Sequence, residues 1–220
     1  MLTRQVHGET RPHYEQVAEQ FAALASRHIA GVGQAGALLT LGRGSWQVVS
    51  QPDTAAGEME QLLKALNEGP AIDATRIRQT VRVMDLAAET RWPRFTASAT
   101  AQTSVRSMAC FPLYTHIHAW GALLLLADQP GGLDAAAEDA GEILATHTAL
   151  TLDAVHHDRH YRSALGSRDI IGQAKGVLME RFDIDAVAAF ALLTRLSEES
   201  HRPVVVVAEE LLETKTSTDR

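Results

Sequence analysis

The residues best suited to binding chemistry lie between positions 165 and 182 of the 220-residue chain. If this segment is a helix, five residues share one side at spacings i, i+4, i+7, i+8 and i+11: Arg168, Gly172, Lys175, Gly176 and Met179. An interior helical glycine costs about 1 kcal/mol relative to alanine, so a pair on one side indicates that another helix or a nucleic-acid backbone comes close to the main chain. A nucleic-acid backbone held by the two cations fits this pattern. A closely packed partner helix fits it equally well.

The surrounding pattern predicts that three helices position this face. A core side of the first helix is predicted at Ile171, Ala174, Leu178 and Phe182. Asp185 is a natural N-cap for a second helix, whose apolar stripe is predicted at Val187, Phe190 and Leu193 with Ser197. Pro203 suits the first turn of a third helix, with an amphipathic pattern at Val204, Val207, Ala208, Leu211 and Leu212. Four consecutive valines also suit a strand, but no turn signal separates them from the helix-forming residues that follow.

The same segment carries a longer motif, made of Arg168, Ile171-Gly172, Ala174-Lys175-Gly176, Leu178-Met179, Ala189-Phe190, Leu193, Ser197 and Val207-Ala208. With these residues the chain from about 160 to 213 resembles an ANTAR domain, the RNA-binding module of bacterial transcription antiterminators. The resemblance implies a three-helix bundle, often dimeric, that binds paired hairpins in nascent RNA and prevents a terminator from forming. In such a site Arg168, Lys175 and Arg195 would contact phosphates or base edges. Gly172 and Gly176 would permit close approach beside Met179, and Ser197 and Ser200 would donate hydrogen bonds.

Two features set limits on that function. Val205 and Val206 stand where members of the family usually carry charged or polar residues, which removes contacts there. From residue 162 to 220 there are eight Lys or Arg against ten Asp or Glu, whereas nonspecific duplex binding leaves a basic footprint. A local patch of Arg168, Lys175, Arg181 and Arg195 must therefore suffice, because RNA loops are recognised by shape, stacking and base edges. The alternatives are a small-molecule sensor whose C-terminal bundle mediates protein contacts, and a DNA-binding helix bundle.

The N-terminal part alternates between helical and strand patterns. A helix is predicted over residues 12 to 30, and another near Glu58 to Asn67, ended by Gly69-Pro70. Strands are predicted at Ala37 to Leu41, Trp46 to Ser50, Val81 to Met84, Val105 to Tyr114 and Trp120 to Ala127. A helix, several strands broken by helices and a long final helix predict an α+β domain with a largely antiparallel sheet.

Short motifs in this part are Gly36-Ala-Leu-Leu-Thr40, Glu68-Gly-Pro-Ala-Ile-Asp73, Asp85-Leu-Ala-Ala-Glu-Thr-Arg-Trp-Pro93, Arg106-Ser107 and Gly121-Ala-Leu. Their order and spacing resemble the GAF domains that precede ANTAR modules. The resemblance implies a sensor pocket or a dimerisation scaffold between sheet and helices, with no ligand assigned. Trp92, Cys110 and Trp120 are the candidates for lining such a pocket, although aromatic side chains at such positions more often belong to the core. The apolar run around Cys110 favours a buried thiol.

The segment from Asp134 to Tyr161 lacks proline and is predicted to be a helix that joins the two domains. Residues recur there in alternating steps of four and three, in a seam that includes two histidines and an alanine, at Ile143, His147, Leu150, Ala154, His157 and Tyr161. This spacing predicts a coiled-coil homodimer, and a single helix packed on its own domain explains it nearly as well. Pairing would present two ANTAR modules to a two-hairpin RNA. A small-molecule ligand of the GAF-like domain would then bias the pairing.

The predicted organisation is a GAF-like sensor and dimerisation domain over 12–158, an ANTAR-like domain over 159–213 and a flexible tail over 214–220. Because no apolar run approaches the roughly 18 residues that span a bilayer, and the N-terminus lacks the apolar core of a signal peptide, we expect a cytoplasmic protein without membrane contact.

Other chemistries find little support. Gly31-Val-Gly33-Gln-Ala-Gly36 has the G-x-G-x-x-G spacing, but it follows a helix and enters a strand, the reverse of a dinucleotide site. His156 and His160 are spaced to share a metal, but no cysteine or carboxylate completes the set. No catalytic serine, zinc-protease or paired-carboxylate motif occurs. We therefore expect no enzyme activity, cofactor or metal.

Overall fold

The computed structural model describes residues 11–40 and 45–218. Leu41, at the predicted end of the first strand, and the last two residues of the predicted tail lie outside these ranges. The chain divides into two compact units between Val155 and His156. Within the described ranges, every helix is too short or too polar to span a membrane.

The N-terminal unit is built on a five-stranded antiparallel sheet with the order β2-β1-β5-β4-β3. The strands are β1 (Gln34–Thr40), β2 (Trp46–Val48), β3 (Val81–Val83), β4 (Ser107–Tyr114) and β5 (Ala119–Ala127). Central strand β5 contains four consecutive leucines, 123 to 126, that are at most 1% exposed. A strand buried on both faces loses the apolar-polar alternation of a half-exposed strand, which is why this stretch is apolar throughout.

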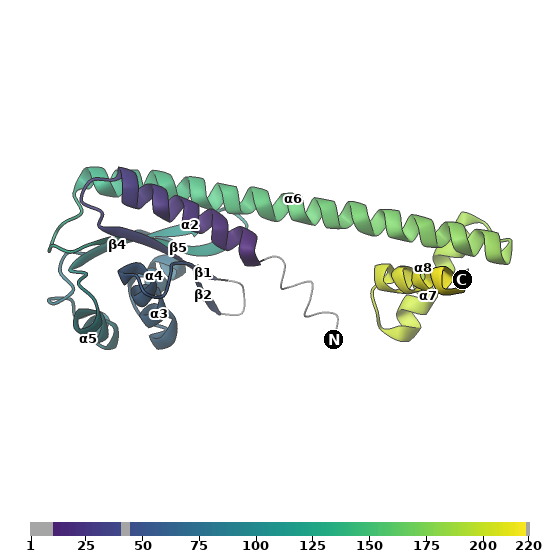
Figure 1. The fold of residues 1–220 in the computed structure, drawn as a ribbon, viewed down its shortest axis with the longest axis horizontal. Coiled ribbons are helices and arrows are strands. Elements are labelled where there is room, and N and C mark those ends of the chain that lie inside the picture. The colour runs from purple at the N-terminus through teal and green to yellow at the C-terminus, as the bar shows by residue number, and fades with distance from the viewer. Residues whose placement is uncertain (1–10, 41–44, 219–220) are drawn as a thin grey trace. The chain divides into compact units, whose positions relative to one another are not determined.

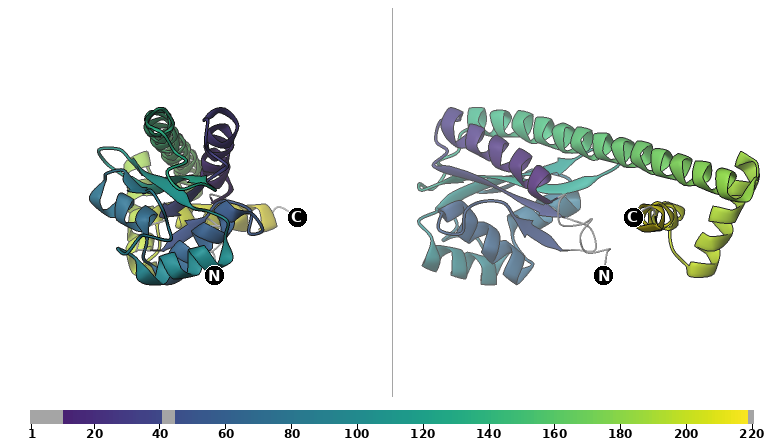
Figure 2. Two further views of the ribbon diagram at one scale, coloured as in Figure 1. Left: turned by 90° about the vertical axis from the view of Figure 1, so that its left-hand side faces the viewer. Right: turned by 45° about the vertical axis from the view of Figure 1, so that its right-hand side comes forward.

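Helices cover both faces of the sheet (Figures 1 and 2). One face carries α2 (Arg11–His28) and the first part of α6 (Ala135–Phe182), and the other carries α3 (Ala55–Leu66), α4 (Pro70–Ile77) and α5 (Pro93–Gln102). Phe111 and Leu123 belong to the core beneath α2 and α6. Cys110 and Leu124, their neighbours in sequence, belong to the core beneath α3, α4 and α5. The fold is therefore α+β, as predicted.

Helices α4 and α5 are absent from the prediction, which took Gly69-Pro70 as the end of a helix. In the structure α3 ends at Leu66, where Asn67 adopts a left-handed conformation with φ of 50°. Gly69 and Pro70 instead begin α4, and Pro93 begins α5 in the same way. Proline suits the first turn of a helix because the N–H that it lacks has no partner there.

The C-terminal unit is a bundle of residues 156–182 of α6 with α7 (Ala186–Ser200) and α8 (Val204–Thr218). Asp185 caps α7 as predicted, because its carboxylate accepts hydrogen bonds from the backbone N–H groups of Val187 and Ala188 at 3.0 and 2.7 Å. The valine-rich third segment is a helix. The buried core consists of Ala174, Leu178, Ala189, Leu193 and Ala208.

Three residues that were predicted to be core are exposed. Phe182, Val187 and Phe190 are 56%, 78% and 46% exposed. In a bundle of three short helices each helix buries only a narrow stripe, and Ala189 and Leu193 supply that stripe on α7. The predicted stripe of α7 was therefore wrong at Val187 and Phe190, and that of α6 was wrong at Phe182.

Candidate nucleic-acid interface

The two glycines of the predicted binding face lie on open surface. A Cβ atom built on Gly172 or Gly176 meets nothing within 4 Å beyond its own stretch of helix. Gly121 of the sheet differs, since a Cβ there collides with the backbone of Leu38. Within the described part of the chain, no partner helix accounts for the glycines of α6. Their face is available to another molecule.

Lys175 lies on this face beside an aromatic ring. Its ammonium is 5.9 Å from the ring centroid of Phe190, and no carboxylate of the described residues pairs with it. Arg168 and Met179 are exposed on the same side of the helix. Arg195 forms an ion pair with Glu199 at 3.7 Å, in which both side chains are about two-thirds exposed, so the pair contributes little stability.

The two predicted serines have structural partners at the end of α7. The Ser197 hydroxyl donates to the carbonyl of Arg202, and the Ser200 hydroxyl donates to that of Leu196 at 2.6 Å. The Arg202 guanidinium in turn donates to Glu210 of α8 at 2.8 Å, and this hydrogen bond lowers the pKa of the Glu210 carboxyl. Ser197 therefore helps to fix the corner between α7 and α8, whereas Ser200 bonds within α7. Val205 and Val206 are half-buried on α8.

The predicted coiled-coil positions of α6 face solvent. Ile143, Leu150 and Tyr161 are 60%, 56% and 67% exposed, and His147, Ala154 and His157 are also exposed. The residues of α6 that pack on the sheet are different ones, Ala145, Ala149 and Leu152 among them. Packing of the helix on its own domain therefore does not explain the four-and-three spacing.

The three candidate pocket residues do not line one cavity. Trp92 and Cys110 lie in the core beneath α3, α4 and α5, whereas Trp120 lies in the core beneath α2 and α6, where its ring is 5.3 Å from that of Tyr14. Burial raises the pKa of the Cys110 thiol well above its usual range. The Trp120 indole donates to the Asp153 carboxylate at 2.9 Å.

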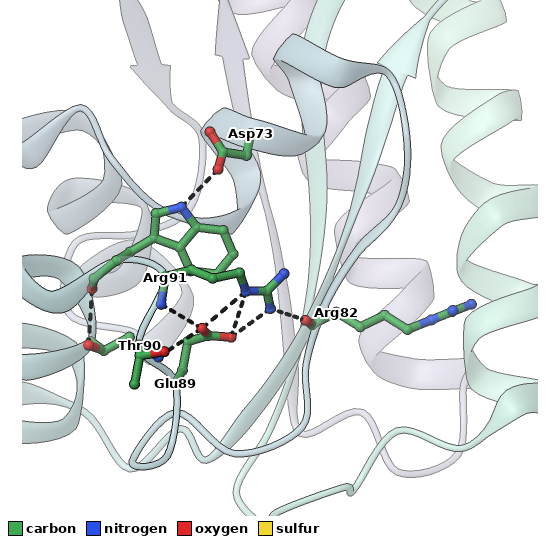
Figure 3. Close-up of polar contacts among 7 residues, drawn as sticks. Asp73, Arg82, Glu89, Thr90 and Arg91 are labelled. Atoms are coloured by element: carbon green, nitrogen blue, oxygen red, sulfur yellow. Dashed lines mark hydrogen bonds and ion pairs between the residues drawn. The ribbon is translucent and has the colours of Figure 1, made fainter.

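Trp92 is buried at the edge of a polar network, whose members Asp73, Glu89 and Arg91 are labelled in Figure 3. The indole donates to Asp73 at 2.9 Å, and the Arg91 guanidinium lies 4.4 Å from the centre of the same ring. Arg91 also binds Glu89 and donates to the carbonyl of Arg82 at 2.7 Å, and its hydrogen bond lowers the pKa of Glu89. Glu89, Arg91 and Trp92 lie in one short motif and Asp73 lies in another, and the sequence does not indicate that they bind each other.

An open groove of about 340 Å³ lies elsewhere on the N-terminal unit, between α2, β1 and the segment that leads into α3. Its polar lining includes Arg27, Gln34, Ser50, Gln51 and Thr54. The side-chain carbonyl of Gln34 accepts a hydrogen bond from the N–H of Ala56 at 3.0 Å, which fixes this wall of the groove. None of the predicted pocket residues lines it.

Comparisons with known proteins agree with this division. The family model described as the ANTAR domain matches residues 159–212. A domain of a two-component sensor histidine kinase protein from Sinorhizobium meliloti 1021 is similar with a TM-score of 0.54 and 13% identity, over 67% of this chain and 96% of that one. The bacteriophytochrome RpBphP3 from R. palustris is similar with a TM-score of 0.55 and 13% identity, over 90% of this chain and 45% of that one. These likenesses concern the fold alone. No curated protein sequence matches the chain.

Proposed function

We propose that this chain, which carries an ANTAR domain at residues 159–212 behind a GAF-like N-terminal fold, is an RNA-binding transcription antitermination regulator. It binds paired hairpins in nascent RNA and prevents a terminator from forming. The observation that carries the proposal is the open face of Gly172 and Gly176 beside Lys175. The function is binding without catalysis, and it needs no metal or cofactor.

The face suits a folded RNA for steric and electrostatic reasons. At the two glycines the helix backbone has no side chain in front of it, so a ribose-phosphate chain reaches van der Waals contact with the main chain. Lys175 supplies a positive charge next to this bare surface, and Arg168 supplies another one turn before Gly172. The interior amides of a helix already donate to carbonyls, so the glycines provide access and the cations provide attraction.

Pairing of two copies through α6 would bring two such faces to one transcript. Ile143 and Leu150 expose apolar surface that the described residues of the chain do not cover, which supports a homodimer seam. When one module binds a hairpin, the second module meets the other hairpin at high effective concentration. A small molecule in the groove between α2, β1 and α3 shifts the pairing if it binds the paired and unpaired forms unequally. Such a regulator acts in the cytoplasm, where nascent RNA is made.

A binding comparison tests the RNA assignment. Fluorescence anisotropy would be measured for a two-hairpin RNA, the same RNA with mutated loops, and duplex DNA. We expect tight binding to the first alone, and a loss of about 10-fold or more in Lys175→Ala, because a hydrogen bond to a charged group is lost. Lys64→Ala is the matched control, since Lys64 is exposed on α3 of the other unit.

Equal weak binding to all three nucleic acids, unchanged in Lys175→Ala, would remove the RNA assignment and favour a bundle that contacts proteins. Preference for duplex DNA would favour a DNA-binding bundle. Native mass spectrometry with and without RNA tests the stoichiometry: we expect two chains per two-hairpin RNA, and one chain at every RNA ratio would exclude the dimer.

A further inference from the structure

We propose that Phe190 is a stacking site for one unpaired base of the hairpin loop, with Lys175 binding the phosphate next to that base. This inference rests on the proposed RNA-binding function. Phe190 comes from α7 and Lys175 from α6, and the two side chains meet with 5.9 Å between the ammonium and the ring centroid. The sequence pattern predicts Phe190 only as part of the apolar stripe of this helix.

The ring is not needed to complete the core of its own bundle. Phe190 is 46% exposed, whereas Ala189 and Leu193 on the same helix are fully buried. Exposing much of a phenyl ring to water has a free-energy cost, because the transfer of apolar surface out of water is favourable. Covering the ring with a ligand recovers that free energy. An exposed aromatic residue beside open backbone is therefore a candidate contact.

The contact with Lys175 leaves the ring accessible. A distance of 5.9 Å is near the outer limit for a cation–π interaction, so the ammonium is weakly held by the ring. It is free to turn towards a phosphate while a base occupies the ring surface. Met179 follows Lys175 by one turn of α6 and is 37% exposed, which adds an apolar edge to the same face.

An unpaired nucleotide matches this combination better than a protein surface does. Every base has an apolar face for stacking and is joined to an anionic phosphate, and single-stranded RNA is commonly bound by aromatic rings with cations beside them. A second protein covering the face would desolvate the unpaired ammonium of Lys175. The bare backbone at Gly172 and Gly176 admits the ribose-phosphate chain alongside.

The test places 2-aminopurine, whose emission falls when it stacks, at each loop position of the two-hairpin RNA in turn. With the full chain we expect quenching at one loop position. Phe190→Leu keeps an apolar side chain and removes the ring; it should abolish that quenching and weaken binding about 10-fold or more, in line with the usual contribution of base stacking on an aromatic ring. Phe190→Trp should retain both signals.

Val187→Ala is the matched control, because Val187 is an exposed apolar residue three positions earlier on α7, and it should behave as wild type. Circular dichroism checks that each variant is folded. If Phe190→Leu binds and quenches like wild type while Lys175→Ala weakens binding, the stacking site is wrong and the RNA function stands. If Phe190→Leu instead lowers the dimer fraction in native mass spectrometry, the ring belongs to an interface between copies. If the wild type binds no structured RNA, both proposals fall.

Discussion

Replacing both glycines of the open α6 face with alanine should make the C-terminal unit more stable and at the same time weaken RNA binding. Alanine is favoured over glycine by about 1 kcal/mol at an interior helix position. Because the new methyl groups at 172 and 176 meet nothing within 4 Å, no clash offsets this gain. The Gly172→Ala, Gly176→Ala double variant should therefore gain about 2 kcal/mol in the free energy of unfolding.

Hydrogen exchange on the full chain is the suitable assay. All three tryptophans, at positions 46, 92 and 120, lie in the N-terminal unit, so tryptophan fluorescence does not report on the bundle. A gain of about 2 kcal/mol slows exchange of the α6 amides by about 30-fold. Gly166→Ala is the control: it is also open but lies outside the proposed binding stripe, so it should gain about 1 kcal/mol and bind RNA normally.

Two results would refute this reasoning. Faster exchange in the double variant would mean that another group packs against the glycines in the free protein. Slower exchange with unchanged RNA affinity would mean that the open face is not the RNA site. Added stability together with weaker RNA binding would show that Gly172 and Gly176 serve a ligand that contacts the helix backbone.

Three further substitutions should change stability or assembly in ways that follow from the contacts and exposure of single residues. Glu60 is buried and accepts hydrogen bonds from the N–H groups of Ala37 and Val49 and from Ser50. Glu60→Gln turns an N–H group towards these donors, so the free energy of unfolding should fall by about 2–3 kcal/mol. Urea unfolding followed by tryptophan fluorescence measures this loss. Burial raises the pKa of Glu60 above its ordinary value of 4.5, so the folded protein binds a proton more tightly than the unfolded chain. Wild-type stability should therefore fall as the pH rises from about 4.5 through the raised pKa, and Glu60→Gln should lack this component. Asp185→Ala removes the cap of α7 and should cost about 1 kcal/mol, seen as faster exchange of its first amides. Leu150→Asp should yield monomers in sedimentation without changing the urea midpoint of the N-terminal unit, because the side chain is 56% exposed.

The sequence predicted the elements whose signals are local. The strands β1, β4 and β5 follow from apolar runs, and the cap at Asp185 follows from a single side chain and two nearby amides. The short helices α4 and α5 were missed because Gly69-Pro70 and Pro93 serve equally well as the end of one helix and the start of another. Only the neighbouring elements decide between these outcomes.

The three candidate pocket residues lie in two different cores because of an irregularity in the sheet that no local sequence pattern reveals. Cys110 pairs with Leu124, and simple alternation along β5 would place Trp120 on the same sheet face as Leu124. The ladder shifts, however, between the pairs Leu113–Gly121 and Tyr114–Ala119, and Gly121 has a φ of 132°. This bulge turns Trp120 to the opposite core. A single extra residue in a ladder thus separated side chains that the sequence suggested would meet.

The acidic balance of the C-terminal unit makes its proposed site selective. Affinity for any nucleic acid grows with the number of phosphates that cations neutralise, and residues 162–220 hold eight Lys or Arg against ten Asp or Glu. Charge alone therefore attracts duplexes weakly, and the free energy of binding must come from contacts that depend on shape. In the proposed site the ring of Phe190 and the bare backbone at Gly172 and Gly176 would supply such contacts. A duplex keeps its bases stacked inside and offers nothing to the ring, whereas a hairpin loop presents an unpaired base beside a phosphate.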